Sequence, residues 1–291
     1  MYRRLALLSI AGAALLTASA CAASSGGSGN QNTAPPSGST SAQAACTPES
    51  MPTQTAGVLT VATDSPAYEP WFVDNKPANG KGFESAVAYA VAKQLGYDTV
   101  KWVVAPFTSV IAPTPKKFDF DINEVSITAK RAKIVDFSSG YYDVAQAVVA
   151  LKNNKYSKAT SISGLHGARL AAQKGTTSLD AINNVIKPVA TPREYPTNDL
   201  AVQALKNGTV DGLVVDLPTG LYITAAEIEG STIVGQLAVT GHPEQFGLVL
   251  DHASPLTSCV SKAVDALRAN GTLKALQQKW LTTAAGAPEL S

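Results

Sequence analysis

Charged residues are scarce in this sequence, and their signs nearly cancel. They make up 15% of the 291 residues, with 23 Lys and Arg against 22 Asp and Glu, and no long basic run interrupts the balance. Proteins that bind nucleic acid need a basic patch or stripe to neutralise phosphates. The composition therefore argues against nucleic-acid binding, and we expect no nucleic-acid partner.

Histidine and cysteine are rare as well. The chain has three of each, too few and too scattered for a zinc site of the usual spacings. It also lacks the G-x-x-x-x-G-K-[ST] motif that holds nucleotide phosphates and the G-x-S-x-G motif of a serine nucleophile. We expect a protein that has no metal or cofactor, does not hydrolyse ATP and is not an enzyme.

The apolar run at the start of the chain, Leu5–Leu16, is too short to cross a bilayer, which takes about 20 residues. It follows the basic segment Met1–Arg4, and this order is typical of a secretory signal. We therefore assign residues 1–20 to a signal peptide and expect export.

The signal peptide ends in Ala18-Ser19-Ala20-Cys21, which resembles a bacterial lipobox. This resemblance implies a lipid on Cys21 that anchors the exported protein to the outer face of the cell membrane, its only membrane contact. Ala18 stands where Leu is commoner, so cleavage before Ala22 by an ordinary signal peptidase stays open as the alternative.

Residues 21–55 are expected to form the lipidated start and a flexible linker. Ala22–Ala45 contains only small and polar residues, with no charge and no large apolar side chain. Such a segment cannot bury enough apolar surface to become ordered. Two cysteines remain, Cys46 and Cys259, and in an exported protein a disulfide between them is favoured over two buried free thiols.

From residue 57 onward, strand-like and helix-like segments alternate. Gly57–Thr63 and Thr99–Val104 have the composition of strands, and Phe83–Leu95 has apolar residues at helical spacing before Gly96. The second half repeats the pattern and ends in two helices; its segments are Arg169–Ala172, a helix from about Ser178, Asp199–Lys206, Val210–Val215, Pro255–Ala269 and Leu273–Leu281. The alternation predicts an α/β fold with a mainly parallel sheet. Apolar residues make up 45% of the chain, which is enough to form the hydrophobic cores of two such lobes.

Two extended apolar runs, Gln146–Leu151 and Phe246–Leu250, are interpreted as crossings between lobes. They predict a discontinuous lobe 1 of residues 56–147 and 244–283, a lobe 2 of residues 148–243, and a tail of residues 284–291. A Cys46–Cys259 disulfide would then lie within lobe 1 and leave motion between the lobes free.

Four segments, in this order, are similar to the bacterial solute-binding proteins of amino-acid ABC transporters, solute-binding protein family 3. They are Thr63-Asp64 with Tyr68-Glu69-Pro70-Trp71-Phe72, Ser126-Ile127-Thr128-Ala129-Lys130-Arg131 with Val135-Asp136-Phe137-Ser138 and Tyr141-Tyr142, Gln173-Lys174-Gly175-Thr176-Thr177, and Asp211-Gly212-Leu213-Val214-Val215-Asp216. The resemblance extends from Leu59 to Leu281. It implies a two-lobed fold like that of type II periplasmic binding proteins, with a two-strand hinge. It also implies a monomer that captures a free amino acid by hinge closure and delivers it to ABC permease and ATPase subunits.

The resemblance assigns the charged ends of the ligand to five residues. Arg131 would hold the carboxylate through two parallel N–H bonds, and Asp216, at the end of a strand, would take the α-ammonium. Ser126 would meet both charged groups, and Thr176 and Thr177 would complete the carboxylate site from lobe 2. The alternatives are a surface Arg131 beside Lys130 and Lys133, a polar turn at the threonines, and Asp216 as a helix N-cap before Pro218.

The resemblance assigns the pocket for the ligand's side chain to Asp64, Tyr68, Trp71 and Phe72. Packing in the core is the alternative for the aromatic residues, above all for Phe72.

Two further positions depart from relatives, because Glu124 stands where a small residue is common and Gln173 replaces a Lys. With Asp64, Glu124 and Asp216 set against Arg131, the site is net acidic, which predicts a polar or basic amino acid. Two other functions stay open: a ligand-sensing domain of a receptor, and a lyase or dehydratase on the same fold with Glu124 as acid or base.

Overall fold

A computed structural model of the chain describes residues 46–238, 241–281 and 287–291. The predicted signal peptide, Cys21 and most of the predicted linker lie outside these residues. The described residues form two larger sheets and one pair of short strands. Within these ranges, no helix is both long and apolar enough to cross a membrane.

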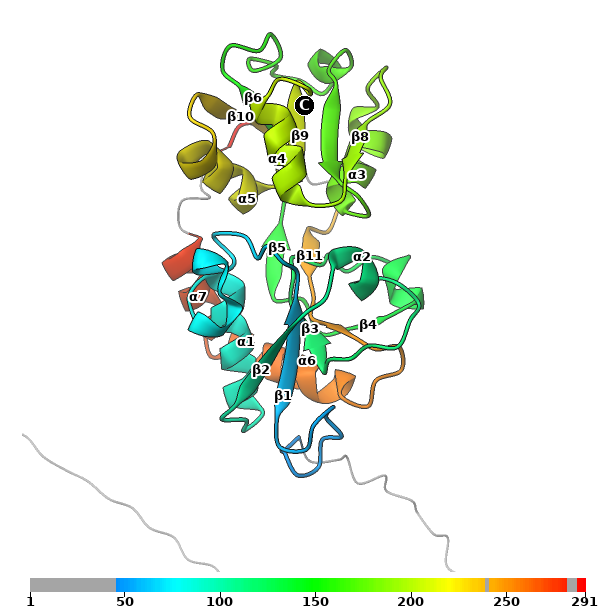
Figure 1. Cartoon of the computed structure of the whole chain (residues 1–291), viewed down its shortest axis with the longest axis vertical. Helices are drawn as coiled ribbons and strands as arrows, with labels where there is room; N and C mark the ends of the chain where they lie inside the picture. The colour runs from blue at the N-terminus through cyan, green and yellow to red at the C-terminus, as the bar shows by residue number, and fades with distance from the viewer. Residues whose placement is uncertain (1–45, 239–240, 282–286) are drawn as a thin grey trace, which may run out of the picture. The chain divides into compact units, whose positions relative to one another are not determined.

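The first lobe is built on a five-stranded sheet of order β2-β1-β3-β12-β4 (Figure 1). β1 is parallel to β2 and β3, whereas β12 is antiparallel to both β3 and β4. The strands are β1 (Leu59–Thr63), β2 (Val100–Val104), β3 (Phe120–Asp121), β4 (Asp136–Phe137) and β12 (Val249–Leu250). The sheet is therefore mixed, because β12 enters it from the far end of the chain in the reverse direction.

Helices cover both faces of this sheet. Its helices are α1 (Phe83–Gln94), α2 (Phe107–Val110), α6 (Thr257–Ala269) and α7 (Thr272–Trp280). Successive residues of a strand point to opposite faces, so Val61 packs in one core cluster with Val87 of α1, and Ala62 packs in another with Phe107 of α2. α1, α6 and α7 also contact one another.

The second lobe is built on a six-stranded sheet of order β13-β10-β6-β9-β7-β8. β7 is parallel to β8 and β9, and β6 is antiparallel to its neighbours β9 and β10. The strands are β6 (Gln146–Leu151), β7 (Leu170–Gln173), β8 (Arg193–Tyr195), β9 (Gly212–Asp216), β10 (Ser231–Leu237) and β13 (Glu289–Leu290). The α/β fold predicted from the alternating segments is confirmed. The sheets are mixed and not mainly parallel as predicted, because β12 and β6 each run antiparallel to both of their neighbours.

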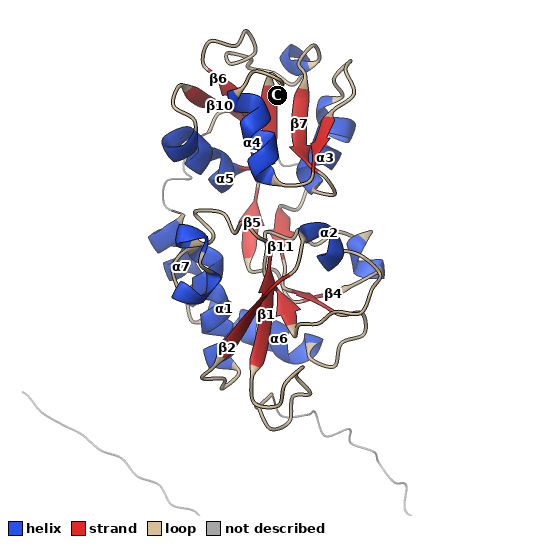
Figure 2. Ribbon diagram, in the orientation of Figure 1, coloured by secondary structure: helices blue, strands red, loops and turns tan. Residues whose placement is uncertain are grey.

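The helices of the second lobe lie against both faces of its sheet. α4 (Asn198–Lys206) contacts β7 and β9, and α5 (Leu217–Tyr222) contacts β6 and β9 (Figure 2). α3 (Thr177–Ala181) and α5 continue into π-helical turns at Ile182–Ile186 and Ile223–Glu227. Short 3-10 turns lie at Val73–Asn75, Pro77–Asn79, Arg131–Lys133 and Ser163–Leu165.

The chain passes between the two sheets through β5 (Tyr142–Val144) and β11 (Glu244–Phe246), which pair antiparallel. The sequence predicted these crossings a few residues later, at Gln146–Leu151 and Phe246–Leu250. Gln146–Leu151 is instead the central strand β6, with five of its six residues buried. An apolar run is typical of a strand buried on both faces, whereas a crossing strand has fewer neighbours and needs less apolar surface.

The end of the chain is not the tail that the sequence predicted. Glu289 and Leu290 form β13, which pairs parallel with β10, and Leu290 is buried. Gly235 of β10 makes this approach possible, because a Cβ there would lie 2.7 Å from Cγ of Leu290. A single apolar residue among polar neighbours has no periodicity, so this strand could not be predicted from its sequence pattern.

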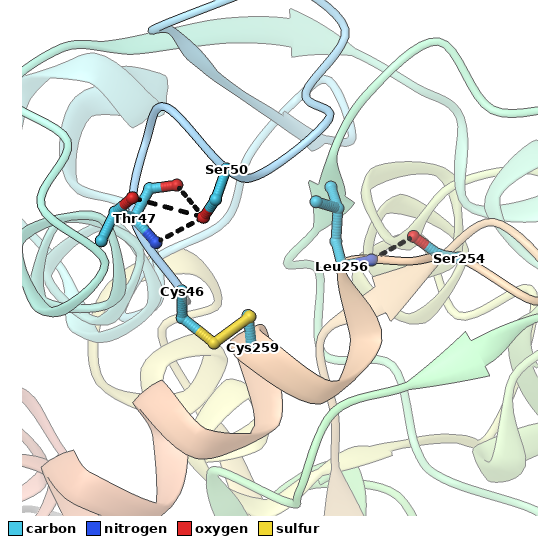
Figure 3. The surroundings of a disulfide bond; sticks show 6 residues. All are labelled: Cys46, Thr47, Ser50, Ser254, Leu256 and Cys259. Carbon is cyan, nitrogen blue, oxygen red and sulfur yellow. Dashed lines mark hydrogen bonds between the residues drawn. A yellow bond between two sulfur atoms is a disulfide. The ribbon is translucent and has the colours of Figure 1, made fainter. Parts of the chain in front are cut away.

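A disulfide bond joins Cys46 to Cys259, which confirms the pairing predicted from the sequence (Figure 3). Cys259 is buried in the first turn of α6, and Cys46 lies beside the turn Thr47–Ser50, where the Thr47 N–H donates to Oγ of Ser50. The two cysteines are 213 residues apart in sequence, yet both pack in the same core cluster of the first lobe. The bond therefore fixes the start of the described chain to that lobe.

We expect the double variant Cys46→Ser with Cys259→Ser to lose about 2–5 kcal/mol of unfolding free energy, because the disulfide restricts the unfolded chain. Urea unfolding of the variant and of the oxidised wild type measures the difference. As a control, a reductant should lower the stability of the wild type and leave that of the variant unchanged. Equal stability of the two oxidised proteins would contradict this role.

Candidate functional site

A cavity lies where the ends of several strands from both sheets meet. Asp64 follows β1, Glu124 follows β3, Gln173 ends β7, and Asp216 ends β9. The carboxyl ends of strands in α/β sheets are the usual place for ligand groups. The cavity contains about 420 Å³ of space, including the part that opens to solvent. Its lining residues are Asp64, Tyr68, Phe107, Asn123, Glu124, Arg131, Gln173, Thr176, Thr177, Asn198 and Asp216.

Most of the residues proposed from the sequence lie around this cavity. Eight of them line it: Asp64, Tyr68, Glu124, Arg131, Gln173, Thr176, Thr177 and Asp216. Ser126 lies next to it, with Oγ 3.1 Å from Oγ1 of Thr177. Their contact with a ligand stays a prediction.

Trp71 and Phe72 do not form the pocket wall that the sequence predicted. Their side chains are fully buried in the core of the first lobe, where the Trp71 ring contacts Phe83, Tyr142 and Phe246 edge to face. A core position is favoured over the pocket wall because these large rings bury the most apolar area when they fill the space between the sheet and its helices. Phe107 of α2 also lines the cavity, although no motif in the sequence indicated it.

Arg131 is a buried cation held by backbone oxygens. Its Nη1 donates to the carbonyl of Ser126 at 2.7 Å, and its Nη2 donates to the carbonyl of Gly175 at 2.9 Å. Its Cζ lies 5.4 Å from the centre of the Phe107 ring. Within the described part of the chain, no carboxylate lies within ion-pair distance of this guanidinium. Burial lowers the pKa of Arg131, and an anion placed beside it would offset this cost by favouring the charged guanidinium.

Thr176 has a structural role that matches the polar-turn alternative. Its Oγ1 accepts from the Leu179 N–H at 3.2 Å and donates to the carbonyl of Gln173 at 2.7 Å. The side chain is therefore the N-cap of α3. Both of these bonds are made within the second lobe, so the hydroxyl of Thr176 has no hydrogen left for a ligand.

Glu244 and Gln146 connect the predicted ligand residues and were missed in the sequence. Glu244 Oε1 accepts from the hydroxyls of Ser126 and Thr177, the latter at 2.6 Å. Gln146 Nε2 donates to Asp216 Oδ1 at 2.7 Å and to Glu244 Oε2 at 3.2 Å. Glu244 begins the crossing strand β11, and Gln146 begins β6 just after the crossing strand β5. A polar side chain beside an apolar run is the one signal that could have found them.

This network determines what the two hydroxyls can offer to the cavity. A hydroxyl has one hydrogen and two lone pairs. Because Ser126 and Thr177 each donate that hydrogen to Glu244, their oxygens can only accept toward the cavity. They therefore suit an ammonium group, whereas a carboxylate needs the guanidinium of Arg131.

The carboxyl groups around the cavity repel one another. Burial, followed by the charge of Glu244, raises the pKa of Asp216 well above its usual value. Burial, followed by the charges of Glu84 and Asp216, does the same for Glu124. Burial also raises the pKa of Asp64. A cationic ligand would offset these costs, because a nearby positive charge favours the ionised carboxylates.

Glu84 lies behind the cavity, in the first turn of α1, and is fully buried. Its Oε1 accepts from the Glu124 N–H at 2.7 Å and from the hydroxyl of Tyr141. Burial raises its pKa to about 7. No group of three or more His, Cys, Asp or Glu side chains in the described ranges could hold a metal ion.

Comparisons with known proteins point to one family. Residues 59–283 match the model of the bacterial extracellular solute-binding proteins, family 3. Over 233 residues the chain is 26% identical to the arginine-binding periplasmic protein of Mannheimia haemolytica, covering 78% of this chain and 93% of that protein. It is 28% identical over 214 residues to the ABC transporter glutamine-binding protein GlnH of Bacillus subtilis, covering 70% and 75%.

Solved structures of similar fold include an ancestral arginine-binding protein bound to arginine. That protein is 31% identical, with a TM-score of 0.65 over 77% of this chain and 98% of the other. An ancestral amino-acid-binding protein, described as a precursor of cyclohexadienyl dehydratase, is also 31% identical, with a TM-score of 0.65 over 77% and 95%.

The raised pKa of Glu84 predicts a pH dependence of stability. Its pKa is 4.5 when exposed and about 7 in the folded protein, so the folded state favours the protonated form. The part of the unfolding free energy that comes from this preference is fully present below about pH 4.5 and is lost as the pH rises through about 7. We expect the free energy of unfolding to fall by up to about 3 kcal/mol over this range through Glu84.

Urea unfolding at a series of pH values measures the slope of the unfolding free energy against pH. Glu84→Gln should remove the part that belongs to Glu84, because the amide keeps an acceptor for Tyr141 and does not titrate. Glu229→Gln, at an exposed position, is the matched control and should keep the wild-type slope. The same slope in Glu84→Gln as in the wild type would contradict the assignment.

Proposed function

The chain belongs to the bacterial extracellular solute-binding proteins of family 3, and from this membership we propose that it binds a free amino acid with a cationic side chain. The observation that carries the proposal is the buried guanidinium of Arg131 in one cavity with the carboxylates of Asp64, Glu124 and Asp216. One cation and three acidic groups complement a ligand that has one carboxylate and two positive groups.

In this proposal Arg131 binds the carboxylate of the ligand, and Asp216 binds its α-ammonium. Gln146 occupies Oδ1 of Asp216 and leaves Oδ2 for the ligand. Ser126 and Thr177 accept further hydrogens of the ammonium. Asp64 and Glu124 take the charge of the side chain, while Tyr68 and Phe107 contact its apolar part. Arginine-binding and glutamine-binding relatives support both the amino-acid class and a long side chain.

Capture would proceed by closure of the two lobes. Arg131 belongs to the first lobe and Asp216 to the second, so a ligand that needs both binds the closed form in preference to the open form. The population then shifts toward closure in proportion to this difference in affinity. We propose that the protein acts as a monomer and passes the amino acid, unchanged, to the permease and ATPase subunits of an ABC importer.

The location that we propose is the outer face of the cell membrane. The leader ends in a lipobox-like sequence, and a lipid on Cys21 would hold the exported protein near its permease. The uncharged segment that follows Cys21 would let the binding protein reach its partner, since such chains behave as flexible linkers.

Isothermal titration against the twenty amino acids tests the ligand. Arginine or lysine should bind more tightly than glutamine, and glutamate or aspartate should bind weakest, because a second carboxylate would face Asp64 and Glu124. Recovery of the bound amino acid in unchanged form tests the absence of catalysis. Tight binding of glutamate or aspartate would refute the charge argument.

We expect Arg131→Ala to cost at least about 2–5 kcal/mol of binding free energy, because it leaves the ligand carboxylate buried and unpaired. The same titration with the preferred amino acid measures the loss. Arg193→Ala, at an exposed position on β8, is the matched control and should bind like the wild type. Near-unchanged affinity in Arg131→Ala would discredit the carboxylate site.

Replacing the lipobox cysteine tests the anchor. Cys21→Ser should release the protein from the membrane fraction, because the variant has no thiol to carry the lipid. Fractionation of cells that express either form, followed by mass analysis of the N-terminus, measures the outcome. A wild-type N-terminus at Ala22 without lipid would indicate ordinary cleavage instead.

A further inference from the structure

Thr219, from α5 of the second lobe, lies between two side chains of the first lobe. Its Oγ1 accepts from Nε1 of Trp71 at 2.7 Å and donates to Oε2 of Glu124 at 2.9 Å. Thr219 is 3% exposed and Trp71 is fully buried. The contact is thus a chain of one buried and one partly buried hydrogen bond that passes from the first lobe to the second and back.

The chemistry of the three groups fixes the direction of these bonds. An indole N–H can only donate, so Oγ1 of Thr219 accepts from Trp71 and keeps its own hydrogen for Oε2 of Glu124. A hydroxyl is the one small side-chain group that satisfies Trp71 and Glu124 together. Serine could replace threonine here, whereas valine has the same shape and can form neither bond.

The first lobe holds both partners of Thr219 in place. The Trp71 ring is fixed by its edge-to-face contacts with Phe83, Tyr142 and Phe246. Glu124 has a φ of +53°, a conformation that non-glycine residues rarely adopt, and its N–H donates to the buried Glu84. A preorganised donor and acceptor therefore face the second lobe.

The second lobe brings Thr219 to these partners on the same segment as Asp216. Asp216 ends β9, and Thr219 follows three residues later in α5. The segment is fixed to the sheet, because the Leu217 N–H donates to the Ala145 carbonyl and Gly220 packs closely on Ile233 and Val149. Movement of Asp216 toward the ligand therefore moves Thr219 toward Trp71 and Glu124.

We propose that Thr219 is a positioning residue that closes a buried hydrogen-bond latch between the lobes and holds Glu124 in its place in the cavity. The proposal rests on the proposed function, because closure serves ligand capture. The latch strengthens every ligand that binds the closed form, since Thr219 itself does not line the cavity, and through Glu124 it also supports a cationic side chain. Asp64, by contrast, faces the ligand's side chain and distinguishes one amino acid from another.

Removing the hydroxyl should weaken the closed form selectively. With Thr219→Val, closure would bury the Trp71 N–H and one oxygen of Glu124 without partners, whereas both reach water in the open form. We expect Thr219→Val to weaken arginine binding by about 10- to 100-fold. Thr219→Ser should stay within about threefold of the wild type. The loss should appear in the dissociation rate and leave the association rate nearly unchanged.

The experiment measures binding of L-arginine and L-glutamine to the wild type, Thr219→Val, Thr219→Ala and Thr219→Ser by titration and stopped flow. Small-angle scattering of each protein, with and without L-arginine, reports closure. The latch predicts a loss for both ligands in the Val and Ala variants, at least as large for L-arginine because Glu124 faces its side chain, together with rescue by Ser and a more open average form. Thr219→Ala keeps the test valid if Thr219→Val does not fold.

Two results would overturn the latch. The first is wild-type binding and closure in the Val and Ala variants. The second is a loss in Thr219→Ser as large as in Thr219→Val, which would indicate packing in place of hydrogen bonding. If the wild type binds none of the twenty amino acids, the proposed function fails. The latch is then judged separately, by whether Thr219→Val is more open than the wild type in scattering.

Discussion

A single buried guanidinium opposite a group of buried carboxylates determines the character of this site. Arg131 is held by the carbonyls of Ser126 and Gly175, and both bonds leave its charge uncompensated. Asp216 and Glu124 are buried near other acids, so ionisation is unfavourable for each of them. A buried guanidinium without an ion-pair partner and buried carboxyl groups that resist ionisation are both stabilised when groups of opposite charge are placed beside them.

The crossing segments contribute more than a flexible connection. Glu244 lies on β11 and Gln146 begins β6, and together they link Ser126, Thr177 and Asp216. These three residues come from both lobes, so the orientation of each depends on the geometry of the crossing. Glu244 and Gln146 therefore contact both lobes and also determine which oxygen atoms of these three residues face the cavity.

The sequence predicted the parts of the fold that depend on local pattern. Neighbouring residues were enough to infer the alternating strands and helices and the C-terminal end of α1 before Gly96. The cysteine pairing could be inferred because the protein is expected to be exported. The motif around Arg131 and the strand that ends in Asp216 located those two residues at the cavity, because strand ends in α/β folds gather at one edge.

The parts that the sequence did not predict depend on contacts between distant segments. Trp71 and Phe72 match a loop motif, but only the packed structure shows that their rings fill the core. Glu244 and Thr219 belong to no motif and acquire roles from partners about a hundred residues away in sequence, as their bonds to Ser126 and Glu124 show.

The short strand β13 makes the chain return once more to the second lobe after α7 has ended in the first. The eight peptide steps from Leu281 to Glu289 span at most roughly 28 Å when fully extended. This covalent connection limits the distance that the edge strand β13 can move from α7. The limit applies in addition to any that the paired strands β5 and β11 set. Every open form of the protein must keep β13 within this distance of the end of α7.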